Sequence, residues 1–303
     1  MRHISKRPFR NQLATPVRGG RRTRGVFINP LVQCDLVIEA VVENLDIKKS
    51  LFGKVAKDEL GDSYAHDMKG TGVHFETPRL IDGVPTARSM ILITPDGERT
   101  MNTYLGACVE FGPADVDPDI VAASAITYME GYLWDPEDAK KAFLEAAGIA
   151  HANNRRVGIT LSDSFCVDRY RAEFIDLLKD GVVDVMFANE HEIKALYETS
   201  DLDTAIAAAR DSGALTALTL GEKGAMAITA NEIVKAEAQP IDDVVDLTGA
   251  GDLFASGFLF GLARDYDLKS STELGCLCAS NVIGHVGARP EKSLKIIAEQ
   301  GGF

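Results

Sequence analysis

The chain is organised around the stretch Asp246-Leu247-Thr248-Gly249-Ala250-Gly251-Asp252, which is followed at once by Leu-Phe-Ala-Ser-Gly-Phe-Leu-Phe at residues 253–260. This order predicts the acidic end of a strand, a glycine-rich turn, and a helix that begins at the turn. The first N–H groups of such a helix have no partner within the helix, and together with the helix dipole they attract negative charge. The stretch therefore indicates a site that can bind a phosphate.

A carboxylate at Asp252 would repel that phosphate unless it had a chemical task there. The task that fits is accepting a proton from a hydroxyl group that attacks the phosphoryl group. Gly249, Ala250 and Gly251 would let a ligand approach the main chain and would aim successive N–H groups at it. The alternative is that Asp252 only caps a buried helix, and the stretch alone leaves both interpretations open.

Length and composition bound the class of protein. A chain of 303 residues with 46% hydrophobic content can bury one large core or two modest ones, and we expect one α/β domain with an appendage. No apolar run reaches membrane-spanning length, and no charged start followed by an apolar core suggests a secretion signal. The cysteines lack a metal-ligand spacing and are expected to be reduced. We therefore expect a cytoplasmic protein that does not associate with membranes.

Charge is distributed unevenly along the chain. Residues 1–24 contain eight Lys and Arg residues and no acid, so the formal net charge of −13 becomes −21 without them. The acidic remainder of the chain, residues 25–303, would repel nucleic acid. We therefore do not expect nucleic acid as a partner. We expect the basic residues 1–24 to be a disordered leader.

From about residue 117 the sequence alternates between short apolar runs and longer amphipathic segments, which is typical of a mostly parallel sheet covered by helices on both faces. The expected strands are residues 125–132, 157–161, 182–187 and 215–220. The expected helices are residues 135–153, 167–178, 190–198 and 202–211. A hairpin of residues 225–228 and 233–236 follows, and three helices beginning near Gly251, Ser270 and Arg289 close the chain.

The amino-terminal part is harder to interpret. Residues 25–47 predict one or two strands, and residues 62–69 predict a helix. Residues 76–107 are rich in β-forming residues and contain a hairpin turn at 95–98. A hairpin with one polar face suits a lid over a cleft, although an ordinary edge hairpin would have the same pattern.

Ligands of open parallel sheets bind beyond the carboxyl ends of the strands. After the strand at 182–187, Asn189 and Glu192 offer one neutral and one anionic oxygen, which could form the outer shell of a hydrated Mg²⁺ near phosphates. They could equally be ordinary helix-start residues. After the strand at 215–220, Gly221 and Gly224 form a turn whose main chain could meet a nucleotide, with Thr219 adding a hydroxyl. A plain hairpin turn is the alternative.

Several familiar nucleotide-binding motifs are absent. The sequence contains no G-x-x-x-x-G-K-[ST], no H-R-D or D-F-G arrangement, and no G-x-G-x-x-G after an expected strand. These absences argue against P-loop enzymes, protein kinases and dinucleotide-binding oxidoreductases. The remaining class is phosphoryl transfer by positioning, anion stabilisation and one base.

These motifs resemble those of the ribokinase-like, or PfkB, sugar and nucleoside kinases. Residues 246–259 match the D-T-x-G-A-G-D signature of that family, except that Leu247 replaces a small polar residue. Residues 189–192 are similar to its N-x-x-E segment, and residues 219–224 to its nucleotide-contacting turn. Residues 278–290, which include Asn281 and His285, resemble the segment that borders the adenine. Residues 52–55, 72–75 and 99–103 look closest to bacterial adenosine-kinase-like members.

The resemblance implies a three-layer α/β/α ribokinase-like fold over residues 25–303, with a mostly parallel central sheet and a small β lid around residues 76–107. It also implies ATP and Mg²⁺ as cofactors, a small nucleoside or sugar as partner, and a monomer or homodimer. By this similarity Asp252 is the base, and residues 249–251 form the anion hole. Glu192 with Asn189 belongs to the magnesium network. The expected nucleotide contacts are Asn189, Thr219, Gly221, Gly224, Asn281 and His285.

The sequence departs from the family pattern upstream, so that residues 25–51 are atypical. The family begins with a strand of the form G-N-x-x-V-D and later carries a Gly-Gly-x-x-x-N segment. Residues 27–33 resemble a degraded copy of the first, which makes Asn29 and Gln33 weak candidates for substrate binding, and the second is missing. The resemblance implies a kinase that phosphorylates a hydroxymethyl group on a ribose-containing substrate, with adenosine as the expected acceptor. The alternatives are a kinase of another sugar, of the ribose or fructose type, and a non-catalytic ATP-binding relative.

Overall fold

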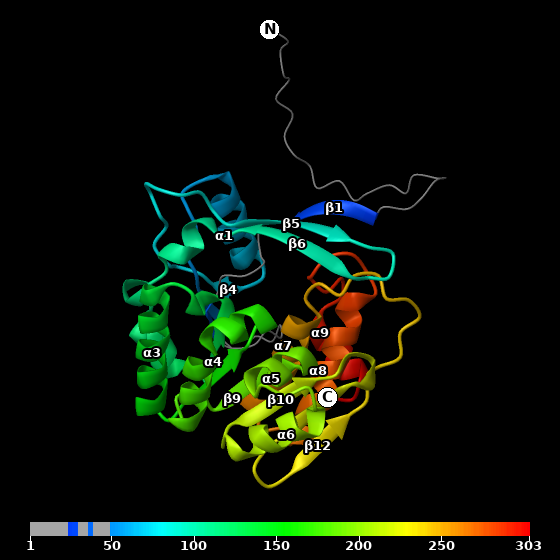
Figure 1. Ribbon diagram of the computed structural model, residues 1–303. Helices are drawn as coiled ribbons and strands as arrows, with labels where there is room; N and C mark the ends of the chain where they lie inside the picture. Colours follow the sequence, from blue (N-terminus) through cyan, green and yellow to red (C-terminus); the bar gives the residue numbers. More distant parts are fainter. Residues whose placement is uncertain (1–23, 30–35, 39–48) are drawn as a thin grey trace, which may run out of the picture.

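The computed structural model describes the backbone of residues 24–29, 36–38 and 49–303, and side chains from residue 50 onward (Figure 1). The candidate Gln33 and the expected basic leader, apart from Arg24, lie outside the described residues. Asn29 is the last residue of strand β1, and its side chain lies outside the description.

Within the described residues the largest sheet is nine-stranded, in the order β12-β11-β10-β9-β8-β7-β2-β3-β4. Strands β7 to β10 are parallel neighbours, whereas β2 and β11 run against the strands beside them. Its strands are β2 (Leu36–Ile38), β3 (Lys49–Phe52), β4 (Val73–His74), β7 (Ile126–Glu130), β8 (Arg156–Thr160), β9 (Val185–Asn189), β10 (Leu215–Thr219), β11 (Ala225–Ile228) and β12 (Ile233–Ala236). The expectation of a mostly parallel central sheet is confirmed.

Helices cover both faces of this sheet (Figure 1). Side chains alternate along each strand. Met186 of β9 therefore packs in one core with Phe174 of α4, whereas its neighbour Phe187 packs in a second core, 5.6 Å from the ring of Phe258 of α7. The helices are α1 (Glu59–Gly70), α2 (Pro118–Ala123), α3 (Glu137–Ala152), α4 (Ser164–Lys179), α5 (Glu190–Leu196), α6 (Leu202–Asp211), α7 (Ala250–Ala263), α8 (Leu268–Ile283) and α9 (Leu294–Gln300). These three layers confirm the α/β/α fold.

A small antiparallel sheet of order β1-β5-β6 lies beside α1 at the top of Figure 1. It consists of β1 (Arg24–Asn29), β5 (Arg88–Ile93) and β6 (Arg99–Tyr104). Alternate residues of β5 are buried and exposed, so one face of this sheet is covered by protein. The hairpin expected within residues 76–107 is therefore present, with its turn between Ile93 and Arg99.

Two expectations about the carboxyl-terminal part are wrong. Asp246 does not end a strand, because the last strand of the sheet, β12, ends at Ala236. The backbone N–H of the preceding residue, Val245, donates a hydrogen bond to the carbonyl of Ile283 at 2.8 Å and not to a neighbouring strand. The last helix begins at Leu294, not near Arg289. Pro290, which follows Arg289, disfavours helical angles in the residue before it.

The cysteines follow the expected pattern only in part. Cys166, Cys276 and Cys278 are free and buried, whereas Cys108 is disulfide-bonded. The expectation of a reduced thiol is therefore wrong for Cys108. Sequence spacing could not indicate this bond, because a disulfide depends on distances that only folding sets. In the described ranges, no helix is both long and apolar enough to span a bilayer.

Candidate active site

The glycine-rich turn opens α7 as the sequence predicts. Gly249 caps the helix with a left-handed φ of 84°, and a Cβ added there would lie 2.8 Å from the Cβ of Ala288. Only glycine meets both conditions. A Cβ added at Gly251 would meet no atom within 4 Å, so the space beside the turn is open. The first i to i−4 bond of the helix runs from Leu253 N to the Gly249 carbonyl at 2.9 Å, and the Ala250 N–H bonds to the Leu247 carbonyl at 3.3 Å. The N–H groups of Gly251 and Asp252 precede the first i to i−4 bond, as at the anion-binding start of a helix.

Asp252 lies in the first turn of α7 and keeps solvent-exposed surface. The surrounding protein nevertheless limits hydration of its carboxyl group, and this desolvation raises its pKa, while the positive charge of Arg99 acts in the opposite direction. A carboxylate that is accessible and poorly hydrated is suited to accept a proton. Arg99 begins β6 of the small sheet, and its proximity to Asp252 was not predicted from the sequence.

Further carboxylates gather at neighbouring strand ends. Burial raises the pKa of Tyr128 on β7, and the negative charges of Glu130, Asp252 and Glu192 raise it further. The charges of these three carboxylates therefore all influence the Tyr128 hydroxyl, although the carboxylates come from different elements. Glu130 ends β7 and Glu192 follows β9, so both lie at the carboxyl edge of the parallel strands, where ligands of such sheets bind.

Asn189 and Glu192 form a reciprocal cap at the start of α5. The Glu192 carboxylate accepts hydrogen bonds from the Asn189 backbone N–H at 2.8 Å and from its side-chain amide at 2.6 Å. Burial raises the pKa of Glu192 to about 7. The alternative interpretation of these residues as a helix start thus has a clear structural basis, and it does not conflict with a role near a cation.

The donors present suit a hydrated cation better than a cage of protein oxygens. No group of three or more His, Cys, Asp or Glu side chains within the described residues could hold a metal directly. Both oxygens of Glu192 already accept hydrogen bonds. Mg²⁺ commonly keeps several water ligands and binds phosphate oxygens, so Glu192 fits the outer shell of such an ion.

The expected nucleotide contacts lie on two segments. Thr219 ends β10 directly beside Asn189 in the parallel register, and Gly221 follows with a φ of 60° and free space around it. A Cβ at Gly224 would lie 2.0 Å from the Ala236 carbonyl oxygen, so the β10–β11 turn itself requires this glycine. Asn281 lies in the last turn of α8, where its amide bonds to the Leu277 carbonyl at 3.3 Å.

Asp246 joins these two parts of the site. Its buried carboxylate accepts hydrogen bonds from the N–H of Thr248 at 2.9 Å and from the N–H of Gly287 at 2.8 Å. His285, in the same loop as Gly287, places its Nε2 atom 2.7 Å from the Arg289 carbonyl oxygen. The glycine-rich turn and residues 284–290 are therefore held as one unit.

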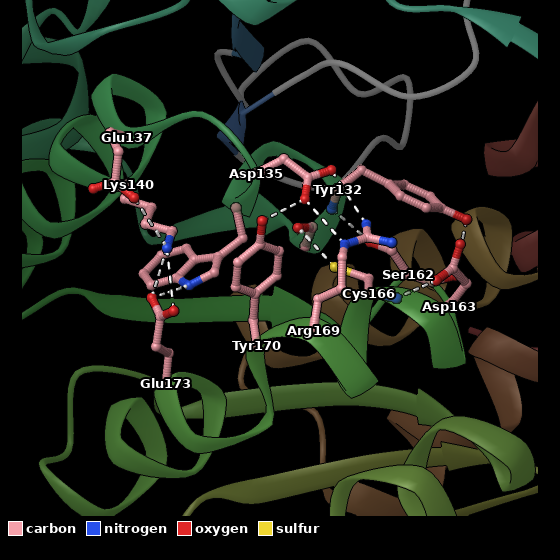
Figure 2. Close-up of polar contacts among 12 residues, drawn as sticks. Tyr132, Asp135, Glu137, Lys140, Ser162, Asp163, Cys166, Arg169, Tyr170 and Glu173 are labelled. Atoms are coloured by element: carbon pink, nitrogen blue, oxygen red, sulfur yellow. Dashed lines mark hydrogen bonds and ion pairs between the residues drawn. The ribbon is translucent and has the colours of Figure 1, made fainter.

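The loops after β7 and β8 are also held together, as Figure 2 shows. The N–H of Tyr132 donates to Ser162 Oγ at 3.2 Å, and the hydroxyl of Tyr132 lies against Asp163. A Cβ added at Gly131 would lie 2.5 Å from the Thr160 carbonyl oxygen, so the approach is too close for a side chain there. Ser162 has a φ of 68°, a strained value that tends to occur at functional sites.

Phe165 extends from the first turn of α4, next to these loops. Its side chain is 73% exposed, which is unusual for a large apolar ring and marks a surface that can bind a ligand or partner. The next turn of α4 is held in place, because Asp135 accepts hydrogen bonds from Arg169 at 3.2 Å and from the Tyr170 hydroxyl at 2.6 Å (Figure 2). Phe165 was not predicted as a site residue, since the exposure of an isolated apolar residue cannot be predicted from the sequence.

Known proteins that are similar to the chain are sugar and nucleoside kinases. Adenosine kinase from Sinorhizobium meliloti is 53% identical, with a TM-score of 0.82 over 85% of this chain and 79% of that one. A probable sugar kinase from Rhizobium etli CFN 42 is 50% identical, with a TM-score of 0.83 over 85% of this chain and 78% of that one. An ATP-dependent ribose-1-phosphate kinase from Halopiger xanaduensis is 26% identical over 269 residues, covering 86% of this chain and 83% of the relative.

The family comparison covers most of the chain. The sequence model of the pfkB family carbohydrate kinases matches residues 40–294. This match includes the turn at 246–252 and the N-x-x-E segment at 189–192, which carried the resemblance in the sequence. The chain belongs to the pfkB family of carbohydrate kinases, phosphotransferases that act on an alcohol group of a sugar or nucleoside.

Proposed function

We propose that the protein is an adenosine kinase, which transfers the γ-phosphoryl group of ATP to the hydroxymethyl group of adenosine and forms AMP and ADP. The observation that carries this proposal is the accessible, poorly hydrated carboxylate of Asp252 within an open, glycine-rich helix start. Such a pairing supplies a proton acceptor and an anion site at adjacent positions.

Asp252 is the base in the proposed reaction. Its carboxylate takes the proton of the acceptor hydroxyl as the hydroxyl oxygen bonds to the γ-phosphorus, and the bond from that phosphorus to the bridging oxygen of ADP breaks. The N–H groups of Gly249 and Gly251 donate hydrogen bonds to the phosphoryl oxygens on which negative charge develops, whereas the Ala250 N–H is bonded to the Leu247 carbonyl at 3.3 Å. Mg²⁺, when bound to the phosphates, neutralises part of the same charge.

The nucleotide side is proposed to include Thr219, Gly221 and Asn281. Thr219 and Gly221 offer a hydroxyl and free main chain next to Asn189, and Asn281 lies close to the 284–290 loop. We assign Gly224 and His285 to the support of these segments, since their contacts are with the protein itself. Glu192 is assigned to the water ligands of the magnesium ion.

The acceptor side is proposed to use aromatic stacking. Phe165 exposes its ring where α4 leaves the carboxyl end of β8, and Tyr132 lies in the adjoining loop. A planar base gains π-stacking energy on such a ring. The 53% identity to a protein named adenosine kinase supports the same choice. We further propose that the hairpin of β5 and β6 is a lid over the acceptor.

A sugar substrate is the second candidate, because a relative at 26% identity is named a ribose-1-phosphate kinase. The test is an acceptor panel of adenosine, ribose, ribose 1-phosphate and fructose at fixed ATP and Mg²⁺, with ADP release as the readout. We expect the highest kcat/KM with adenosine. A higher value with any of the sugars would reject adenosine as the substrate, and ATP binding without turnover of any acceptor would indicate a non-catalytic relative.

A further inference from the structure

The turn of the β5–β6 hairpin is docked on the segment that leads into the glycine-rich turn. The backbone N–H of Leu247 donates a hydrogen bond to the Gly97 carbonyl at 3.1 Å. A Cβ added at Gly97 would lie only 2.8 Å from Val244 Cγ1, and Gly97 has a left-handed φ of 84°. The absence of a side chain at position 97 thus permits both the turn and its contact.

Hydrogen bonds within the hairpin turn hold residues 94–98 in one conformation, so a shift at one residue of the turn moves its neighbours too. The N–H of Thr94 donates to the Glu98 carbonyl at 2.8 Å, and the N–H of Gly97 donates to the Thr94 carbonyl at 3.0 Å. Asp96 Oδ1 accepts from the Thr94 hydroxyl at 2.5 Å and from the Glu98 N–H at 3.2 Å. These bonds give the turn one defined shape before it meets Leu247.

Arg99 follows this turn directly, as the first residue of β6. Its charge acts on the Asp252 carboxyl and opposes the rise in pKa that desolvation causes there. Leu247, in turn, immediately precedes Thr248, whose N–H is bonded to Asp246. Docking at Gly97 therefore places the start of β6 against the segment from which the glycine-rich turn begins, and it supports that segment.

We propose that Gly97 is a positioning residue for phosphoryl transfer, which docks the turn between β5 and β6 against Val244 and Leu247 and thereby supports the start of the glycine-rich turn. The inference rests on the proposed roles of Asp252 and of residues 249–251. A displacement of the hairpin turn would leave both substrates able to bind but would misalign the reacting groups. Misalignment of about 1 Å can lower turnover by roughly 100-fold, so the effect belongs mainly in kcat.

The test is Gly97→Ala, in which the new Cβ meets Val244. We expect kcat to fall by roughly 10- to 100-fold, with little change in the KM values and in the folded fraction. The matched control is Gly72→Ala, because Gly72 has a similar φ of 76° but a Cβ there would meet no atom within 4 Å. Its kcat should stay close to that of the wild type. Since both changes strain the backbone, the difference between them isolates the contact with Val244.

The double variant Gly97→Ala with Val244→Ala tests the contact further, because it removes Cγ1. We expect it to recover much of the lost kcat. An unchanged kcat in Gly97→Ala, or an equal loss in the double variant, would overturn the proposal.

Amide hydrogen exchange separates this inference from the proposed function. In the wild type the Leu247 amide should be protected, and in Gly97→Ala it should exchange at least roughly tenfold faster, whereas the Thr248 amide keeps its bond to Asp246. Equal Leu247 exchange in both proteins would reject the docking even if adenosine is the substrate. Conversely, lack of adenosine turnover in the wild type would reject the proposed function and leave the exchange result to decide the docking.

Discussion

The carboxylate of Asp246 accepts a hydrogen bond from the backbone N–H of Gly287 at 2.8 Å, although the two residues lie on different segments. The same carboxylate also accepts a hydrogen bond from Thr248 at 2.9 Å. This bridge joins the proposed phosphate site to the loop at 284–290, so the two can bind one nucleotide as a preformed unit.

Replacement of Asp246 by Asn should weaken this bridge, because an amide nitrogen cannot accept a hydrogen bond. One buried N–H then lacks its partner, which costs about 1–3 kcal/mol of folding free energy. The KM for ATP should rise as the two segments separate. Urea unfolding and ATP kinetics measure these effects. The exposed Asp242 provides the control, since Asp242→Asn should change neither quantity. Wild-type stability in Asp246→Asn would refute the structural role of the bridge.

Replacement of Phe165 by Ala should raise the KM for adenosine. Loss of one stacked ring removes roughly 1–3 kcal/mol of binding free energy, or about 5- to 150-fold in affinity. The KM for ATP should not change. Phe165→Tyr preserves the ring and should behave like the wild type. If Phe165→Ala and the wild type share the same adenosine KM, the exposed ring is not part of the acceptor site.

Replacement of Arg99 by Gln should shift the pH dependence of turnover. The Arg99 charge lowers the pKa of Asp252 against the rise caused by desolvation. Without that charge the pKa rises, so a higher pH is needed to keep Asp252 ionised. The acidic limb of the kcat/KM profile should therefore move to higher pH. Arg88→Gln, on the same hairpin, is the control. Coincident acidic limbs for Arg99→Gln and the wild type would exclude this electrostatic role.

Glu192 should make the metal-free protein less stable as the pH rises. Burial raises its pKa from 4.5 to about 7, so the folded state holds the proton more tightly than the unfolded chain. Its contribution to stability is fully present below pH 4.5 and is lost as the pH rises through 7. The loss is roughly 3 kcal/mol.

Urea unfolding of the wild type and of Glu192→Gln across this pH range measures that contribution. The stability of the wild type relative to Glu192→Gln should fall as the pH rises, because Gln does not titrate. A difference that stays constant with pH would show that folding does not raise the pKa of Glu192 and would reject this contribution.

The regular part of the fold could be predicted from local patterns. The hairpin of β11 and β12 and helix α6 have the expected bounds, because the periodicity of apolar residues and the turn residues between them are properties of the local sequence. The cap formed by Asn189 and Glu192 is likewise local, since its members lie three residues apart.

The long-range relationships could not be predicted. Gly97 contacts Val244, and Arg99 acts on Asp252, only because the small sheet folds against the carboxyl-terminal half of the chain. Asp246 was expected at a strand end, yet its partner Gly287 lies in a loop whose path no local pattern indicates. Such contacts depend on the packing of distant segments, which a single sequence does not reveal.

The most direct test of the proposed function is the formation of labelled AMP from adenosine and γ-labelled ATP by the wild type and by Asp252→Asn. Asn keeps the size of the side chain but cannot accept the proton, so kcat should fall by roughly 10²- to 10⁴-fold. ATP affinity, measured by calorimetry, should change little. Labelled AMP formed at a similar rate by both proteins, or by neither, would contradict the assignment of Asp252 as the base of an adenosine kinase.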